Sequence, residues 1–510
     1  MGEGSRGLTH RTISGLVWTA MGNGGSTVLS FLSLMVMARL VSPREFGTVG
    51  AALVVIEFSS IFSRLGLGPA VIQRQQLEPR HLKAAFAGSL LFGLVTGLVI
   101  WFLAPSAATF YRNPQVLPVM RVLACVFPLK GISAVAESLM YRDLRFRWMA
   151  NLDLTTLAVS QGLVAIPMAL AGYGVWALVG GVLAQNLLSS ATLLYVRRPT
   201  IGLWPERAAL GDMMYFGGGF TLAKIANYFA LQGDNLVVGH WLGPVALGAY
   251  ERAYGIMANP ASALGKVLDA VLFPTMARVQ DDVVRLGKAY RRGVAVIALV
   301  ALPASAVAVV LAPELIRVAL GSRWNDAVVP FQVLAAGTLF RSSYKMSDSL
   351  ARTTGVVYRR AQRQAIYAAL VIGGAFFGRY WGITGVAVGV LGALVANFLL
   401  MAQLSLEVCR LTWASFWSAH RPSLLVAGAA GVVSWTVATL LRQASAPALP
   451  ILGLAGAASC ATVLWLMRRY PQHCLGSEGM WTIGAMTTFL SRSRRPKDPV
   501  VTGASVGESA

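Results

Sequence analysis

Charge is scarce in this chain of 510 residues: only 13% of the residues are Asp, Glu, Lys or Arg, whereas 56% are hydrophobic. The mean hydropathy is +0.62. Soluble domains carry about twice that share of charged residues, so the composition excludes a soluble enzyme. Apolar runs of about 20 residues recur along the whole chain, and each can cross a bilayer core as a helix. Lipid offers backbone amides no partner, so helical spans are predicted.

Cysteine is also rare, and catalytic motifs are missing. The four cysteines are Cys125, Cys409, Cys460 and Cys474. No pair has metal-ligand spacing, and their number and positions do not indicate a disulfide framework. The chain contains no Walker A or HExxH motif. The sequence therefore predicts no enzyme active site, no metal site and no cofactor.

Acidic residues are half as frequent as basic ones, with 21 Asp and Glu against 43 Lys and Arg and a net charge of +22. In a soluble protein this excess would indicate a nucleic-acid partner. Here 29 of the basic residues fall in alternate connecting segments and termini, and only 7 fall in the segments between them. This bias follows the positive-inside rule. It predicts a multi-pass membrane protein with both termini cytoplasmic and no nucleic-acid partner.

Hydropathy predicts an all-α polytopic membrane protein with fourteen transmembrane helices. The predicted helices lie near 14–38, 46–66, 84–104, 115–140, 150–171, 174–196, 213–238, 245–274, 290–312, 327–350, 361–381, 383–407, 421–441 and 449–467. The expected organisation is a cytoplasmic N-terminus (1–13), an N-terminal six-helix bundle (14–198), a cytoplasmic linker (199–212), a C-terminal six-helix bundle (213–408), an extra helix pair (421–468) and a flexible cytoplasmic tail (469–510).

Similar short motifs also occur in both halves of the chain. ARLVSPREFG (38–47) and GHWLGPVALG (239–248) share Pro and Gly at an offset of 201 residues. At an offset of 211, GVWALVGGVLAQNLL (174–188) matches GVAVGVLGALVANFL (385–399) at seven positions. Helices 1–6 and 7–12 therefore read as one unit used twice. Because six is even, both copies enter from the same face, which predicts a parallel repeat around a central cavity.

The repeated Pro and Gly motif is typical of a helix start. Ser42 is expected to cap the second helix, with Pro43 in its first turn and Glu45 completing a capping box. Gly243 and Pro244 are expected to start the eighth helix in the same way. Gly47 and Gly248 would let a neighbouring helix approach closely.

Several charges fall at mid-depth in the predicted spans, where each should face a partner or a watery cavity. The candidate cavity cations are Lys130, Lys224, Arg341 and Lys345, and Asp234 is a candidate for carrying a coupled proton or cation. Lys130 and Arg341 are each followed, seven residues later, by an acid of the same helix face, Glu137 and Asp348. The excess of cations favours an anionic cargo. The alternative interpretation is that such charges form internal ion pairs that hold helices together.

The same stretches carry a family resemblance. ARLVSPREFG (38–47), GLGPAVIQR (66–74), FYRNPQVLPVMRVL (110–123), GYGVWALV (172–179) and GDNLVVGHWLG (233–243) resemble the Wzx-type oligosaccharide flippases, in particular the colanic-acid-exporter-like branch. This branch lies within the multidrug/oligosaccharidyl-lipid/polysaccharide exporter superfamily. The resemblance covers about residues 12–410 and fades over the last two helices and the tail.

The resemblance implies two six-helix bundles that alternate access to a central cavity. The implied cargo is an undecaprenyl-pyrophosphate-linked oligosaccharide, the repeat unit of an exopolysaccharide, capsule or O-antigen. A polysaccharide polymerase and a chain-length regulator are the implied protein partners. Two alternatives remain open: a multidrug or small-solute exporter of the same superfamily, and a membrane-embedded polysaccharide polymerase or ligase.

Overall fold

The computed structural model describes residues 24–64, 67–74, 77–198, 225–474, 476 and 480, and these residues are helical with short connections and no strand. The first part comprises the helix Gly24–Leu40, α2 (Pro43–Arg64), α3 (Leu67–Gln73), α4 (Pro79–Phe110), α5 (Val116–Leu123), α6 (Val126–Arg142), α7 (Phe146–Val159), η1 (Ser160–Ala165), α8 (Ile166–Leu170) and α9 (Val175–Val196). We call it the first bundle.

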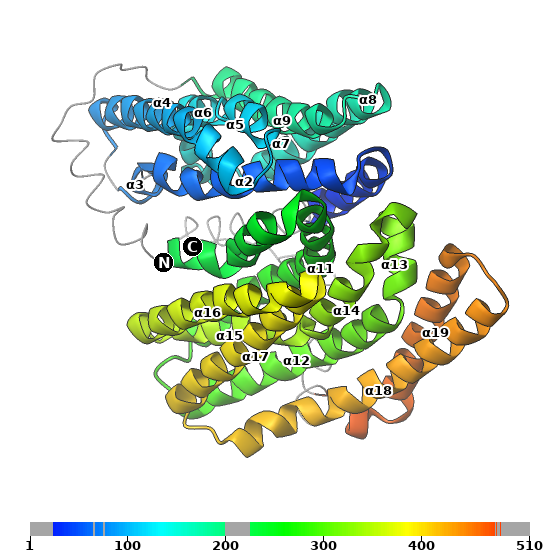
Figure 1. Cartoon of the computed structure of the whole chain (residues 1–510). Helices are drawn as coiled ribbons and strands as arrows, with labels where there is room; N and C mark the ends of the chain where they lie inside the picture. The colour runs from blue at the N-terminus through cyan, green and yellow to red at the C-terminus, as the bar shows by residue number, and fades with distance from the viewer. Residues whose placement is uncertain are drawn as a thin grey trace, which may run out of the picture.

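The second bundle begins with a helix over 225–237. It continues with η2 (Val238–Leu242), α11 (Gly243–Ala277), α12 (Val283–Val310), α13 (Ala312–Ala319), η3 (Ser322–Ala327), α14 (Val328–Ala336), α15 (Thr338–Thr353), α16 (Val357–Gly378), η4 (Arg379–Trp381) and α17 (Gly382–Cys409). Two further helices, α18 (Trp413–Gln443) and α19 (Ala448–Arg469), form a C-terminal hairpin. Figure 1 shows the first bundle on one side and the second bundle with the hairpin on the other, and α2 and α11 lie where they meet.

The described residues include nine helical stretches that are long and apolar enough to cross a membrane. One of the nine, Val357–Cys409, contains two successive helices, α16 and α17, which are joined at η4. The chain is therefore a multi-pass helical membrane protein. Most of the predicted helices have a counterpart in the structure, and α4 and α18 extend well beyond the predicted 84–104 and 421–441.

The connections alternate between two ends of the molecule. We call the end that holds the turns at 41–42, 111–115, 171–174, 379–382 and 444–447 the Pro43 end. The turns at 143–145, 278–282, 354–356 and 410–412 lie at the other end, where most Lys and Arg of the connections are found, and we call it the basic end.

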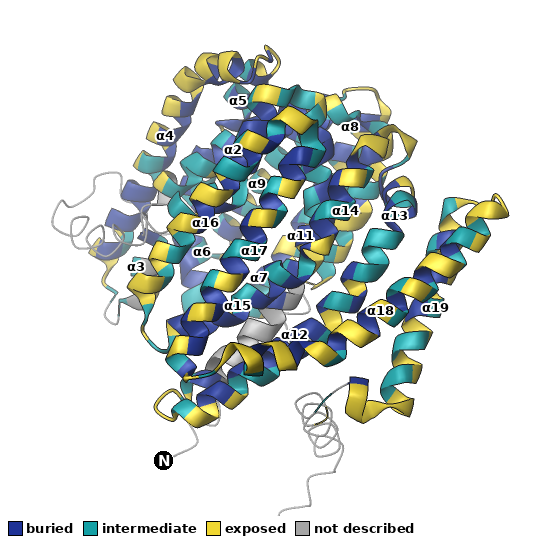
Figure 2. Ribbon diagram, turned by 60° about the horizontal axis from the view of Figure 1, so that its bottom comes forward, coloured by how far each residue is buried: buried dark blue, intermediate teal, exposed yellow. Residues whose placement is uncertain are grey.

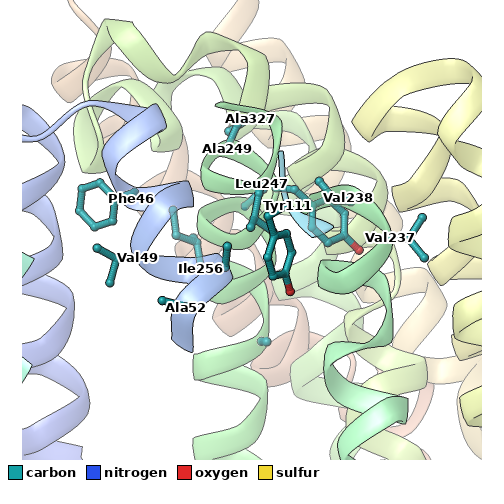
Figure 3. Packing of buried hydrophobic residues seen from close by; sticks show 14 of the residues in the cluster. Phe46, Val49, Ala52, Tyr111, Val237, Val238, Leu247, Ala249, Ile256 and Ala327 are labelled. Atoms are coloured by element: carbon teal, nitrogen blue, oxygen red, sulfur yellow. The ribbon is translucent and has the colours of Figure 1, made fainter. Parts of the chain in front are cut away.

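The largest core cluster joins the two bundles, with α2 contributing from one side and α11 from the other. Figure 3 shows Phe46 and Val49 of α2 near Leu247 and Ile256 of α11, with Tyr111 from the end of α4 beside them. These side chains are almost fully buried. The largest part of the core therefore sits between the bundles at the Pro43 end, and smaller buried apolar clusters lie inside each bundle.

The C-terminal hairpin packs against the outside of the second bundle, where α18 runs along α12 (Figure 2). Near the Pro43 end, the Arg442 guanidinium makes two hydrogen bonds to the Glu314 carboxylate, each 2.8 Å long. Leu311 and Ile451 lie in a small apolar cluster beside this ion pair. Much of the rest of the hairpin surface is exposed Leu, Val and Trp, which suits contact with lipid.

Three features differ from the sequence prediction. The helix expected over 115–140 is broken at residues 124–125, and the one expected over 327–350 is broken at Gly337. The segment between α12 and α14, predicted to be a short loop, folds into α13 and η3. Of the predicted segments, 1–13 and 199–212 lie outside the described residues, as does most of 469–510.

Candidate functional site

The two copies of the repeated motif meet each other. A Cβ atom added to Gly47 of α2 would lie 1.7 Å from the Pro244 carbonyl oxygen, and one added to Gly248 of α11 would lie 2.0 Å from the Pro43 carbonyl oxygen. Only glycine fits at these two positions. The contact is reciprocal, as in an interface related by a two-fold axis.

Each helix start at this crossing is fixed locally. The Ser42 backbone N–H and hydroxyl both donate to Glu45 Oε2, at 2.8 and 2.7 Å, and α2 begins at Pro43. Ser42 and Glu45 thus form the capping box that the sequence indicates. Gly243 starts α11 with a φ of +85°, a left-handed conformation that favours glycine.

Toward the basic end from the crossing, a row of polar groups connects the bundles. The Tyr228 hydroxyl donates to the Val54 carbonyl of α2, and the Gln232 amide donates to Glu57 Oε2 at 2.9 Å. The Asn235 amide in turn donates to Gln232 Oε1 at 2.6 Å. Polar groups of both bundles therefore meet between membrane-spanning helices, and Glu57 remains exposed there.

Glu57 is the charged residue of this row that sequence reasoning missed. It is an exposed carboxylate on α2, surrounded in sequence by apolar residues, and a lone acid in such a run was the signal that could have found it. Lys130 of α6 and Glu251 of α11 lie within electrostatic range of Glu57. Lys130, a predicted cavity cation, is half-buried.

Asp234 and Arg341 are buried deeper in the second bundle. Asp234 is 2% exposed and accepts hydrogen bonds from the Tyr250 hydroxyl at 2.7 Å and from the Asn235 backbone at 2.9 Å. Arg341 is 8% exposed. Its guanidinium donates to the Tyr254 hydroxyl and lies 4.9 Å from the centroid of that ring.

The burial of Arg341 differs from the expectation of a guanidinium that faces water. Tyr254 contacts it, and Tyr344, Tyr367 and Asp234 lie within electrostatic range. Aromatic faces and phenol oxygens can hold a cation without a carboxylate in contact. Tyr250 and Tyr254 lie between the carboxylate of Asp234 and the guanidinium of Arg341. The spacing of residues along one helix cannot predict this arrangement, because the residues come from different helices.

The other predicted site residues occupy varied surroundings. Lys345 is half-buried and crosses Gly265 of α11, where an added Cβ would lie 2.9 Å from the lysine Nζ. Asp348 pairs with Arg352 at 3.2 Å and with Arg360 of α16. Glu137 is half-buried and lies within electrostatic range of Asp153. Lys224 lies outside the described residues.

Comparison with known families decides the relationship of the chain. A family model described as polysaccharide biosynthesis protein matches residues 36–329, which is more than half of the chain. The chain belongs to the polysaccharide biosynthesis protein family. The resemblance read from the sequence motifs is confirmed at this level.

The chain is similar to two proteins that are named for polysaccharide biosynthesis. It is 25% identical over 443 residues to the lipopolysaccharide biosynthesis protein WzxC of Escherichia coli (strain K12), covering 84% of this chain and 89% of that protein. It is 26% identical over 324 residues to the succinoglycan biosynthesis transport protein ExoT of Rhizobium meliloti (strain 1021), covering 63% and 65%.

A solved structure shares the fold. The lipid II flippase MurJ in an inward closed conformation superimposes on this family member with a TM-score of 0.72 at 12% identity, covering 89% of this chain and 99% of that chain. At this identity the likeness shows the fold alone. It agrees with a polytopic helical membrane protein.

Proposed function

We propose that this protein translocates undecaprenyl-pyrophosphate-linked oligosaccharide repeat units across the bacterial inner membrane by alternating access. The observation that carries the proposal is the row of polar and charged side chains where the membrane-spanning helices of the two bundles meet, on the basic-end side of the Gly47–Gly248 crossing. Relatives named for lipopolysaccharide and succinoglycan biosynthesis, one of them named as a transport protein, support it. The protein is then a transporter, not an enzyme.

The proposed architecture is fourteen spans in two parallel six-helix repeats (14–198 and 213–408) with an extra helix pair (421–468). The reciprocal contact of Pro43 and Gly47 with Pro244 and Gly248 supports a two-fold axis along the membrane normal. The breaks at 124–125 and at Gly337 fall at nearly the same place in the two repeats. The positive-inside rule then places the basic end and both termini in the cytoplasm.

The negative charge of the proposed cargo favours its outward movement and its binding to cations of the protein. The candidate contacts for a pyrophosphate are Lys130, Lys224, Arg341 and Lys345, and Asp234 is the candidate for ion coupling. Outward movement of two negative charges is favoured by about 4–5 kcal/mol at a membrane potential of about 100 mV, inside negative. The polar sugars need a wet path, whereas the lipid tail stays in the bilayer. A polymerase and a chain-length regulator are the proposed protein partners.

Deletion of the gene tests the function directly. We expect lipid-linked repeat units to accumulate inside the cell while surface polysaccharide is lost, and the wild-type gene to restore export. A deletion strain that exports normal polymer, with no second gene of the family, would refute the proposal.

A second experiment tests the cations. Replacing Lys130 and Lys345 together by Ala should leave the protein in the membrane and reduce export at least tenfold. Lys288→Ala, at an exposed lysine near the start of α12, is the matched control and should export normally. Equal export by both variants would assign Lys130 and Lys345 structural roles.

One observation favours a second function. Glu57 is an exposed carboxylate within a membrane-spanning helix, and such a group suits an organic cation. A multidrug exporter is therefore the alternative candidate. Overexpression should then raise resistance to cationic dyes, and Glu57→Gln should abolish that resistance.

A further inference from the structure

The segment of α13 and η3 closes over the Pro43 end and contacts the first bundle. Trp324 of η3 is fully buried. Its indole N–H donates to the Ala38 carbonyl at 2.9 Å, and its ring meets Phe46 edge-on with centroids 5.3 Å apart. A side chain of the second bundle is therefore seated within the first.

The hydrogen bond from Trp324 caps a helix end. Ala38 lies in the last turn of the helix Gly24–Leu40, where carbonyl groups have no intrahelical donor. The backbone N–H four residues later belongs to Ser42, and it donates to Glu45 instead. Trp324 thus supplies the hydrogen bond that the backbone of the first bundle cannot provide.

The first bundle caps a helix of the second in the same way. Arg39 Nη2 donates to the Val318 carbonyl at 2.9 Å. Val318 lies in the last turn of α13, so its carbonyl is also without an intrahelical donor. Arg39 follows Ala38 directly, so both capping bonds meet at one point and the two bundles exchange helix caps there.

The same segment is tied to the C-terminal hairpin. Glu314 of α13 accepts two hydrogen bonds from Arg442 of α18, and Arg442 also donates to the Val310 carbonyl at 3.0 Å. Any movement of α13 away from the first bundle must therefore move the hairpin or stretch this ion pair.

We propose that α13 and η3 form a latch that holds the Pro43 ends of the two bundles together, and that the C-terminal hairpin sets its strength through Glu314 and Arg442. The latch rests on the proposed function, because it acts only if the two bundles separate and close again during alternating access. Separating the bundles breaks both capping bonds at once and uncovers Trp324. Water at the membrane surface can replace both bonds, so the latch is reversible.

Distance measurement in the whole protein tests the latch. Spin labels are attached to cysteines that replace Arg112 in the first bundle and Asp326 in the second, both exposed at the Pro43 end, in a variant without the four native cysteines. Trp324→Phe keeps a ring against Phe46 but removes the N–H donor, and Arg39→Ala removes the other donor. Each should raise the population with separated Pro43 ends about two- to tenfold.

The control is Trp435→Phe, at an exposed tryptophan of α18, which should leave the distances unchanged. Arg39 is exposed, so Arg39→Ala tests the latch even if Trp324→Phe lowers the yield of folded protein. Unchanged distances in Arg39→Ala and in the double variant Arg39→Ala/Trp324→Phe would overturn the latch. A shift in both but none in Glu314→Gln would remove the hairpin from it.

Export assays separate the latch from the proposed function. If the distances shift as expected while the gene deletion leaves polymer export intact, the latch stands and the proposed cargo fails. If export depends on the gene but the distances do not respond to either donor, the cargo stands and the latch fails.

Discussion

The crossing of α2 and α11 makes the sharpest prediction for stability. In Gly248→Ala the new Cβ would lie 2.0 Å from the Pro43 carbonyl oxygen and 3.0 Å from the Gly47 backbone nitrogen. Carbon–oxygen contacts begin at about 3.3 Å, so the helices must part by about 1.3 Å or rotate. The obstacle is helix backbone, which cannot rotate away as a side chain can.

Two opposing effects decide the size of the change. Overpacking a tight core costs about 1–3 kcal/mol, and a backbone obstacle places this site near the upper limit. Alanine is favoured over glycine within a helix by about 1 kcal/mol. We therefore expect Gly248→Ala to lose about 1–2 kcal/mol. Gly392→Ala in α17 is the matched control, because an added Cβ there meets no atom within 4 Å.

The assay is thermal unfolding of the purified proteins in one detergent, followed by the loss of monomer on size exclusion. Gly248→Ala should unfold at a lower temperature than wild type, and Gly392→Ala at the same or a higher one. The double variant Gly47→Ala/Gly248→Ala should lose less than the sum of the single losses, because both methyl groups press on one crossing. If Gly248→Ala proved as stable as Gly392→Ala, the close-contact reasoning would be wrong.

Three further predictions concern polar contacts. Burial alone would raise the pKa of Glu314, but Arg442 outweighs it and leaves the pKa lowered. The ion pair therefore stabilises the protein at pH values above the ordinary carboxyl pKa, and this stabilisation is lost as the pH falls through the lowered pKa. Glu314→Gln should cost about 2 kcal/mol of stability in thermal unfolding at pH 7, and less in acid. Thr48→Val removes the buried acceptor of the Asn113 amide (2.9 Å) and should cost about 1–3 kcal/mol in the same assay, whereas Thr48→Ser should cost less. Arg142 donates to two carbonyls at the end of α3, so Arg142→Ala should speed amide hydrogen exchange there and leave that of α17 unchanged.

The sequence predicted a multi-pass helical membrane protein correctly, because long apolar runs are enough to indicate one. It also predicted the capping box of Ser42 and Glu45, since those two residues lie within one helical turn of each other. The breaks at 124–125 and at Gly337 were missed, because hydropathy continues unchanged across each break. Local sequence patterns could therefore predict the helices and where they start, but not the breaks within them.

Contacts between distant segments were beyond the sequence. The glycines at 47 and 248 indicated a close neighbour, but the pattern could not show that each is the neighbour of the other. Asp348 pairs with Arg360 of the next helix as well as with Arg352 of its own. The hydrogen-bond acceptor of Trp324 is a carbonyl 286 residues away. Such pairs depend on how the helices are arranged and not on their composition.

The two central charges explain why binding and motion would be linked on the proposed function. Tyr250 and Tyr254 lie one turn apart on α11, and the first holds Asp234 while the second holds Arg341. A direct ion pair would have satisfied both charges and left neither for cargo. Instead, in the described structure Arg341 Nε makes no hydrogen bond and yet is closed to solvent. An anion can reach this Nε only if Arg341 or the side chains around it move, and one of those neighbours, Tyr254, lies on α11, which carries the crossing that joins the bundles. On the proposed function, cargo that draws Arg341 from Tyr254 would thereby act on the same helix that crosses α2 between the bundles.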